Sequence, residues 1–179
     1  RVALIGCGAQ GQTQMQSLLN IPGVRFQAVC DIWASYNQKL VEGRLRAKKQ
    51  EVNAYEDYRE MLDKESNNID AVFIATPDFW HAQHTVDSLS AGKHVYCEKM
   101  MADTVENARQ MVKASQDTGN LLQIGHQRRS NPRYLALLDG LVRGNNEFKR
   151  KILGRITHCY GQWHRSKSSS EIKEPKQKY

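Results

Sequence analysis

Residues 2–11 read VALIGCGAQG, a run of four apolar residues followed by the pattern GxGxxG. The apolar run predicts a buried strand over residues 2–6, and the residues after it predict a helix from about Gly11 to Leu19. Between a strand and a helix, the first glycine of this pattern permits a tight turn, and the second lets a phosphate approach the backbone. The third lets the helix pack closely on the strand, so that the helix N-terminus faces the phosphates. The stretch therefore predicts a dinucleotide-binding turn.

The second predicted strand, residues 26–31, ends on Asp31, which lies 20 residues after the last glycine of the turn. A carboxylate at this place accepts hydrogen bonds from the adenosine ribose hydroxyls and repels a 2′-phosphate, so NAD(H) is favoured over NADP(H). Two simpler interpretations stay open: a glycine-rich turn that binds nothing, and an aspartate that only caps the segment after it.

Short apolar runs alternate with amphipathic segments along most of the chain. This alternation is typical of a parallel sheet covered by helices on both faces. We therefore predict an α/β fold, with a Rossmann-like doubly wound parallel sheet. The further strands are predicted over residues 71–75, 94–98 and 121–125, with a short strand or extended piece over 52–58 and a looser strand over 156–163. The further helices are predicted over residues 32–48, 80–91, 104–119 and 132–143, with a short one that ends near residue 62.

Polar and ionisable residues follow three of the later predicted strands. Residues 76–81 read TPDFWH, Glu98 and Lys99 end the next strand, and residues 126–129 read HQRR after the last one. The carboxyl ends of parallel strands lie at one edge of the sheet, where the ligands of open α/β folds bind. These residues are therefore expected to gather with the glycine turn around one cleft.

Three stretches after the glycine turn carry a resemblance to a known family: ATPDFWH at 75–81, AGKHVYCEKMMA at 91–102 and GHQRRSNPRY at 125–134. In this order they resemble the motifs of the glucose-fructose oxidoreductase, inositol dehydrogenase and MocA family, and the likeness extends over residues 2–163. The resemblance implies a two-domain NAD(P)-dependent oxidoreductase that acts on sugars, sugar phosphates, inositols or related compounds. It implies a Rossmann-like first domain and a second α/β domain that covers the nicotinamide and often forms the oligomer contact.

The resemblance also carries the cofactor contacts of the family over to positions of this chain. It implies that the pyrophosphate is held at the glycine turn by Gly6, Gly8, Ala9, Gln10 and Gly11, and that the adenosine ribose is bound by Asp31. It further implies that the central and nicotinamide parts of the cofactor are contacted by Thr76, Pro77, His81, Glu98 and Gln127. Glu98 is expected at the nicotinamide ribose or its surroundings.

Lys99 is the catalytic residue that the resemblance implies. It matches the lysine of the family's Glu-Lys-Pro motif, which touches the substrate hydroxyl and assists proton transfer. Arg128 and His164 are further candidates for substrate binding. Met100 stands where the family usually has proline, so packing instead of a proline ring has to fix the backbone beside Lys99. His84, in contrast, is interpreted as an exposed helical residue without a part in the site.

The resemblance divides the chain into an NAD-binding Rossmann domain over residues 1–150 and the beginning of a second domain over 151–179. Residues 153–165, LGRITHCYGQWHR, are similar to the entry strand of that second domain, and a polar tail follows over 166–179. We therefore expect a piece of a longer protein, whose missing part supplies a further aspartate and histidine to the active site. The piece alone is expected to bind the cofactor and to be nearly inactive.

Composition and charge argue against several other classes of protein. The net charge is +7, but residues 1–120 carry −2 and residues 121–179 carry +9. The basic end contains no DNA- or RNA-binding motif, so a solvated surface or attraction for an anionic ligand is favoured over nucleic-acid binding. The sequence contains no run of about 18 apolar residues, so it predicts no membrane-spanning helix. The four cysteines lack metal-ligand spacing and are expected to be reduced thiols.

These features together predict an NAD-dependent oxidoreductase that transfers a hydride between a hydroxyl of a sugar, inositol or related polyol and the nicotinamide. Two alternatives stay open: an NAD-dependent glycosidase with transient oxidation, and a dinucleotide-binding protein without catalysis. The expected partner is a small carbohydrate or polyol, without nucleic acid or membrane, in a homo-oligomer formed through the missing domain. The expected compartment is the cytoplasm, or the periplasm or the exterior if a leader has been removed.

Overall fold

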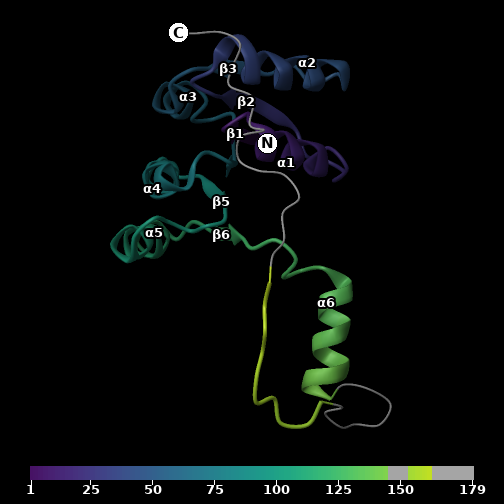
Figure 1. Ribbon diagram of the computed structural model, residues 1–179. Helices are drawn as coiled ribbons and strands as arrows, with labels where there is room; N and C mark the ends of the chain where they lie inside the picture. Colours follow the sequence, from purple (N-terminus) through teal and green to yellow (C-terminus); the bar gives the residue numbers. More distant parts are fainter. Residues whose placement is uncertain (145–152, 163–179) are drawn as a thin grey trace. The chain divides into compact units, whose positions relative to one another are not determined.

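The computed structural model describes residues 1–144 and 153–162 of the chain. Its centre is a six-stranded parallel sheet in the order β3-β2-β1-β4-β5-β6 (Figure 1). The strands are β1 (Val2–Ile5), β2 (Phe26–Cys30), β3 (Asn53–Tyr55), β4 (Ala71–Ile74), β5 (His94–Glu98) and β6 (Leu122–Gly125). The chain starts in the middle of the sheet, winds outward to β3, and then crosses back to wind from β4 to β6. The predicted doubly wound α/β fold is confirmed.

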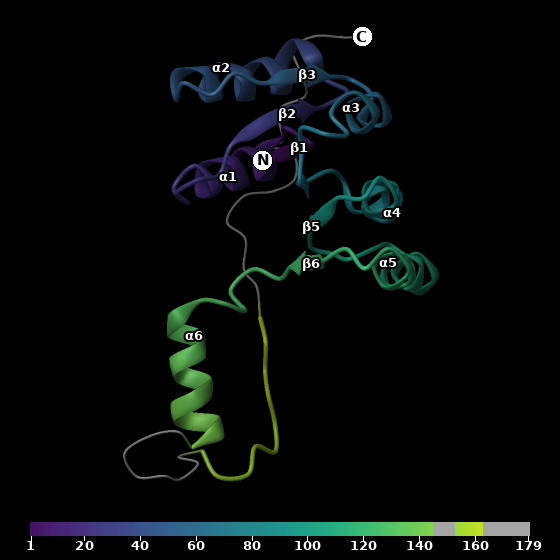
Figure 2. The same ribbon diagram turned by 180° about the vertical axis from the view of Figure 1, so that it is seen from behind.

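Helices cover both faces of this sheet (Figures 1 and 2). On one face lie α1 (Ala9–Leu18) and α2 (Lys39–Ala47), and on the other lie α3 (Tyr58–Lys64), α4 (His81–Ser90) and α5 (Val105–Thr118). The π-helical turn η1 (Ala34–Gln38) precedes α2, and the 3-10 turn η2 (Asp78–Trp80) precedes α4. The helix predicted over 132–143 consists of α6 (Pro132–Leu137) and the π-helical η3 (Leu138–Arg143).

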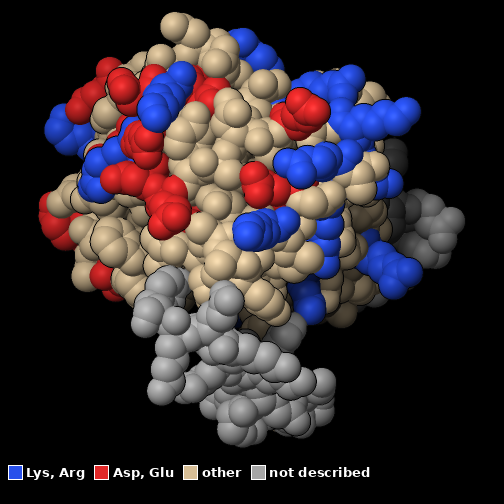
Figure 3. Space-filling model, turned by 90° about the horizontal axis from the view of Figure 1, so that it is seen from above, with Lys and Arg blue, Asp and Glu red and all other residues tan. Residues whose placement is uncertain are grey.

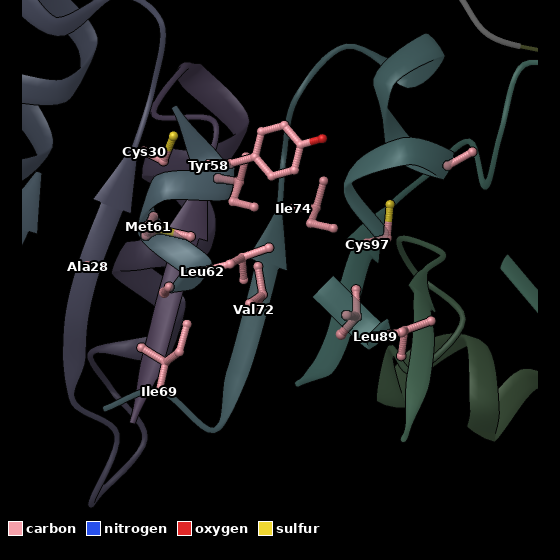
Figure 4. Close-up of a cluster of buried hydrophobic side chains, with 14 of the residues drawn as sticks. Ala28, Cys30, Tyr58, Met61, Leu62, Ile69, Val72, Ile74, Leu89 and Cys97 are labelled. Atoms are coloured by element: carbon pink, nitrogen blue, oxygen red, sulfur yellow. The ribbon is translucent and has the colours of Figure 1, made fainter. Parts of the chain in front are cut away.

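The strands are apolar on both sides because each face of the sheet packs against helices. Successive side chains of a strand point to opposite faces. In β1, Val2 and Leu4 share a buried cluster with side chains of α1 and α2, whereas Ala3 and Ile5 share one with α3, α4 and α5. Figure 4 shows the second cluster, which includes Tyr58, Met61, Leu62, Leu89, Val72, Ile74 and Cys97.

The cysteines within the described residues are free thiols, as the sequence predicts. Cys7, Cys30 and Cys97 are buried in or beside the sheet, and Cys159 is exposed. Burial raises the pKa of the Cys30 thiol to about 12, so this group stays protonated near neutral pH. The three buried cysteines therefore act as small apolar core residues.

The chain forms two compact units, Arg1–Arg128 and Arg129–Tyr179. The first contains the whole sheet, and no helix in the described residues is long and apolar enough to cross a membrane. The predicted domain boundary near residue 150 lies outside the described residues, and so do His164 and the predicted polar tail. Within the looser strand predicted over 156–163, residues 156–162 have no regular secondary structure. A strand needs a hydrogen-bonded neighbour, and none is described beside this segment.

Candidate functional site

In the glycine turn between β1 and α1, backbone segments approach one another too closely for side chains at Gly6 and Gly11. Gly6 has a φ of +93°, and a Cβ built on it would lie 2.7 Å from the carbonyl carbon of Ala75. A Cβ on Gly11 would lie 1.9 Å from the carbonyl oxygen of Gly6. Gly8, the N-cap of α1, differs, because a Cβ there would meet no described atom within 4 Å. Gly6 and Gly11 thus close the turn, while Gly8 leaves space in front of the helix.

The space in front of α1 fits a phosphate group. Ala9 and Gln10 begin the helix, and the N–H groups of a first helical turn have no acceptor inside the helix. These groups and the positive end of the helix dipole favour an anion at this place. No acidic residue lies in the first turn of α1 to oppose it. The residues present therefore suit the pyrophosphate of a dinucleotide.

Asp31 is tied to the glycine turn from the end of β2. Its Oδ2 accepts a hydrogen bond from the Cys7 backbone N–H at 2.7 Å, and its Oδ1 accepts one from the Trp33 N–H at 2.8 Å. The carboxylate therefore does cap the segment after it, which was the simpler interpretation. A carboxylate has about four acceptor positions, so two backbone donors leave capacity for ribose hydroxyls. Asp31 is only half-buried, which leaves it accessible to such a ligand.

A basic side chain reaches the glycine turn from α2. Arg44 Nη1 donates to Gln12 Oε1 at 2.7 Å, and Gln12 Nε2 donates to the carbonyl oxygen of Cys7 at 3.0 Å. Figure 3 shows that Lys and Arg side chains gather on the side of α2, whereas on the side of α3 Asp and Glu side chains are mixed with Lys and Arg. The basic side is the one connected to the glycine turn, and its charge favours the approach of an anionic ligand.

His84 holds the loop after β4, although the sequence predicted an exposed residue without a part in the site. It is 7% exposed, and its Nδ1 lies 3.1 Å from Thr76 Oγ1. Its ring stacks on Trp80 with 5.5 Å between centroids and meets the Tyr58 ring edge-on at 4.4 Å. The prediction of exposure is wrong because this face of α4 packs against α3 and the β4 loop instead of facing solvent.

His81, the first residue of α4, joins two loops of the site. The ring is 1% exposed, with Nδ1 at 2.6 Å from the Met100 carbonyl oxygen and Nε2 at 2.9 Å from the Thr76 carbonyl oxygen. Carbonyl oxygens only accept hydrogen bonds, so the ring serves both partners when each nitrogen carries a hydrogen. The backbone beside Lys99 is thus held by His81 in the absence of the expected proline. Contact between His81 and a cofactor stays a prediction.

Glu98 and Lys99 lie side by side at the end of β5 but in opposite surroundings. Glu98 is 5% exposed, and its Oε1 accepts hydrogen bonds from the side-chain amides of Gln10 at 2.9 Å and Gln14 at 2.7 Å. The Lys99 side chain is exposed, and its backbone N–H lies 3.3 Å from Glu98 Oε2. The two side chains form no ion pair in the described part of the chain. The strand end therefore presents a buried acceptor and a separate exposed amine.

The remaining predicted residues follow the same row of strand ends. Thr76 and Pro77 come after β4, and Gln127 and Arg128 come after β6, where both side chains are exposed. In the sheet, β1, β4, β5 and β6 are consecutive neighbours, so these segments leave adjacent strands at one edge. His164, the last candidate, lies outside the described residues. Ligand contacts of these residues stay predictions.

Sequence reasoning missed four residues of this edge: Gln12, Gln14, Arg44 and His84. Gln10 and Gln14 are four residues apart, so their place on one face of α1 could have been recognised. Their common partner Glu98 is 84 residues from Gln14, and no spacing rule connects the two. The role of His84 depends likewise on how α4 is seated on the sheet.

The pH dependence of stability offers a test of His84. Burial lowers the pKa of His84 to about 4, whereas an unfolded histidine has a pKa of about 6.5. Between these values the unfolded chain binds more protons, so the free energy of unfolding falls as pH is lowered from 6.5 to 4. We expect His84→Gln to remove a part of this fall, at most about 3 kcal/mol.

Denaturant unfolding at several pH values measures the effect. The matched control is His126→Gln at an exposed position after β6, and this variant should keep the wild-type pH dependence. A His84→Gln variant with the same pH dependence as the wild type would contradict the assignment of a buried neutral ring.

The chain has relatives among known proteins. The profile of an oxidoreductase family described by an NAD-binding Rossmann fold matches residues 1–126. A 4-carboxy-2-hydroxymuconate-6-semialdehyde dehydrogenase of Sphingobium sp. is 33% identical over 144 residues, which cover 80% of this chain and 44% of the relative. An alpha-N-acetylgalactosaminidase of Shewanella oneidensis is 32% identical over 122 residues, which cover 66% of this chain and 26% of the relative.

The fold is also similar to that of solved structures. The crystal structure of myo-inositol 2-dehydrogenase from Lactobacillus plantarum matches with a TM-score of 0.68 and 30% identity, over 81% of this chain and 41% of that one. The chain thus spans less than half the length of each of these three proteins. The family profile covers well over half of the chain and includes the glycine turn, Asp31 and the Glu98-Lys99 pair. The chain therefore belongs to the glucose-fructose oxidoreductase, inositol dehydrogenase and MocA family of oxidoreductases, which has an NAD-binding Rossmann fold.

Proposed function

We propose that this chain binds NAD(H) along the carboxyl edge of its sheet and that the full-length gene product oxidises or reduces a sugar, inositol or related polyol. The observation that carries the proposal is the row of strand ends. The glycine turn, Asp31 and the Glu98-Lys99 pair follow β1, β2 and β5 at the same edge. The likeness to an inositol dehydrogenase supports a ring hydroxyl as the reacting group.

The residues of this chain would divide the work as follows. Bound NAD+ supplies the acceptor for a hydride from the carbon that carries the hydroxyl. Lys99 Nζ, in its neutral form, accepts the hydroxyl proton while the carbon–oxygen single bond becomes a carbonyl. Asp31 and Glu98 accept hydrogen bonds from the two ribose units and orient the cofactor. His81 holds the backbone of the neighbouring Met100 and thereby restricts where Lys99 can reach.

A second function is favoured by one observation, the likeness to an alpha-N-acetylgalactosaminidase. In an NAD-dependent glycosidase the hydride is removed and later returned, so the cofactor is not consumed. The same arrangement of Lys99 and the cofactor would serve the first step of that reaction. The two functions differ in their net products and can be separated by assay.

The decisive experiment uses the full-length gene product with NAD+ and a panel of sugars, inositols and aryl glycosides. Net formation of NADH with a sugar or inositol supports the oxidoreductase. Release of the aryl group at catalytic amounts of NAD+, without net NADH, supports the glycosidase. NAD+ binding without turnover of any compound would leave a dinucleotide-binding protein and overturn both enzymatic proposals.

Asp31 is the residue that should set the choice between the two dinucleotides. We expect Asp31→Asn to reduce the preference for NAD+ over NADP+ by roughly 10- to 100-fold, because hydrogen bonds to a charged group contribute about 1.5–3 kcal/mol. The asparagine keeps one oxygen as an acceptor but loses the charge that repels the 2′-phosphate. Calorimetric titration of this chain with both dinucleotides measures the preference.

The control for Asp31 is Asp63→Asn, at an exposed position on α3. This change should leave both dissociation constants at the wild-type values. Tighter binding of NADP+ than of NAD+ by the wild-type chain would overturn the role proposed for Asp31.

A further inference from the structure

The buried carboxylate of Glu98 is supported by neutral amides instead of a cation. No ion pair within residues 1–144 and 153–162 includes Glu98, although the side chain is 5% exposed. Burying a carboxylate is unfavourable unless hydrogen bonds replace water. The Nε2 groups of Gln10 and Gln14 supply two such bonds, both to Oε1. The positive end of α1, where Gln10 lies, adds to the stabilisation of the charge.

The two oxygens of Glu98 are used differently. Oε1 accepts both side-chain amides, at 2.9 and 2.7 Å. The described contact of Oε2 is longer, 3.3 Å to the Lys99 backbone N–H. A carboxylate oxygen accepts about two hydrogen bonds, so Oε1 is filled and Oε2 keeps capacity for a donor from a ligand. The two glutamines therefore decide which oxygen remains for the cofactor.

The side-chain amide of Gln14 is oriented so that its Nε2 donates to Glu98, and in this orientation its own oxygen has no hydrogen-bond donor in the described part of the chain. The Gln14 side-chain oxygen is buried and has no hydrogen-bond partner in the described part of the chain. Turning the amide round would place this oxygen against Glu98 Oε1 and lose the 2.7 Å bond. An apolar side chain would fill this nearly buried position without leaving an acceptor unpaired. Core packing alone thus gives no reason for a glutamine here.

We propose that Gln10 and Gln14 are positioning residues for the nicotinamide half of the cofactor. They hold Glu98 Oε1 so that Oε2 accepts a hydrogen bond from a hydroxyl of the nicotinamide ribose. The same helix begins at the glycine turn, so one rigid element presents both the pyrophosphate contact and the support of Glu98. This inference rests on the proposed binding of NAD(H).

The proposal predicts an effect on one half of the cofactor only. NAD+ contains the nicotinamide ribose, whereas ADP ends at the pyrophosphate. The pyrophosphate contact proposed for Gln10 is made by its backbone N–H in the first turn of α1, which a leucine keeps. Loss of either side-chain amide should therefore weaken the binding of NAD+ and leave the binding of ADP unchanged. A general distortion of α1 would weaken both, because the pyrophosphate contact lies at the start of the same helix.

The experiment titrates the 179-residue chain with NAD+ and with ADP by calorimetry. We expect Gln14→Leu and Gln10→Leu each to raise the dissociation constant of NAD+ about tenfold, with that of ADP changed less than about twofold. Gln16→Leu is the matched control, since Gln16 is exposed on the same helix, and it should change neither constant. In a Glu98→Ala background, Gln14→Leu should have no further effect on NAD+ binding.

Several results would overturn the proposal. One is an equal loss of NAD+ and ADP affinity in both glutamine variants, and another is unchanged NAD+ affinity in both. A third is an NAD+ dissociation constant that Gln14→Leu raises as much in the Glu98→Ala background as it does in the wild-type chain. Gln10 is only half-buried, so Gln10→Leu keeps the test valid if Gln14→Leu does not fold. A wild-type chain that binds ADP and NAD+ equally well overturns this inference alone, whereas one that binds neither overturns the proposed function as well.

Discussion

Replacing Gly11 with alanine should destabilise the chain by about 3 kcal/mol and reduce NAD+ affinity by about 100-fold. The added Cβ would lie 1.9 Å from the carbonyl oxygen of Gly6. This oxygen belongs to the backbone and cannot rotate away. Gly6 is itself closely packed, because a Cβ built on it would lie only 2.7 Å from the carbonyl carbon of Ala75. The start of α1 would therefore have to move away from β1, and its first-turn N–H groups would leave the phosphate site.

Substitutions at two other glycines distinguish an effect on stability from an effect on NAD+ binding. Gly8→Ala puts a Cβ into open space at an ordinary φ of −66°, so the chain should fold normally but lose the close approach of the pyrophosphate. Gly43→Ala on α2 meets no described atom and should increase stability by about 0.5–1 kcal/mol without affecting NAD+. Chemical denaturation and calorimetric titration measure both quantities. A Gly11→Ala chain with wild-type stability and affinity would refute the role of this contact.

The largest effect on catalysis is expected at Lys99. In the full-length gene product, Lys99→Met should lower kcat by 10²- to 10⁴-fold, the range typical of a lost general base. The NAD+ dissociation constant should stay near the wild-type value, because the Lys99 side chain is exposed and only its backbone N–H contacts Glu98. Steady-state assays with the best substrate of the panel give kcat, and titration gives the dissociation constant.

The control for Lys99 is Lys113→Met, which removes an exposed lysine paired with Asp117 on α5. This variant should keep the wild-type kcat. Added small amines should restore part of the activity of Lys99→Met if the missing group is a base. A Lys99→Met enzyme with a kcat within about threefold of the wild type would exclude Lys99 as the base.

Local patterns carry most of the fold and the outline of the site. Short continuous runs of apolar residues predicted the strands, because a strand buried on both faces is apolar at several consecutive positions. The glycine turn could be recognised because its three glycines act within six residues. Asp31 could be recognised because one helix, a short loop and one strand separate it from the turn. The ends of helices were less certain, and η1 interrupts the single helix predicted over residues 32–48.

The support of the site residues did not follow from the sequence. Nothing near Met100 in the chain indicated that His81 would hold its carbonyl group, and the sequence showed His84 only as one of two histidines on a polar helix. Both contacts depend on how α4 packs against the loops after β4 and β5: His84 contacts Thr76, and His81 contacts Met100. Hydrogen bonds of this kind depend on the distance and angle between elements, which no spacing along the chain encodes.

Glu98 and Lys99 illustrate the division between the two sources of information. The sequence by itself determined that both residues end a strand at the ligand-binding edge, because a parallel sheet places all its carboxyl ends together. Only the tertiary structure decided that Glu98 is buried under two amides of α1, one of them 88 residues away, and that Lys99 points outward. The physical reason is that strand and helix formation follow from local periodicity, whereas the partner of a buried carboxylate is set by how α1 packs on β5.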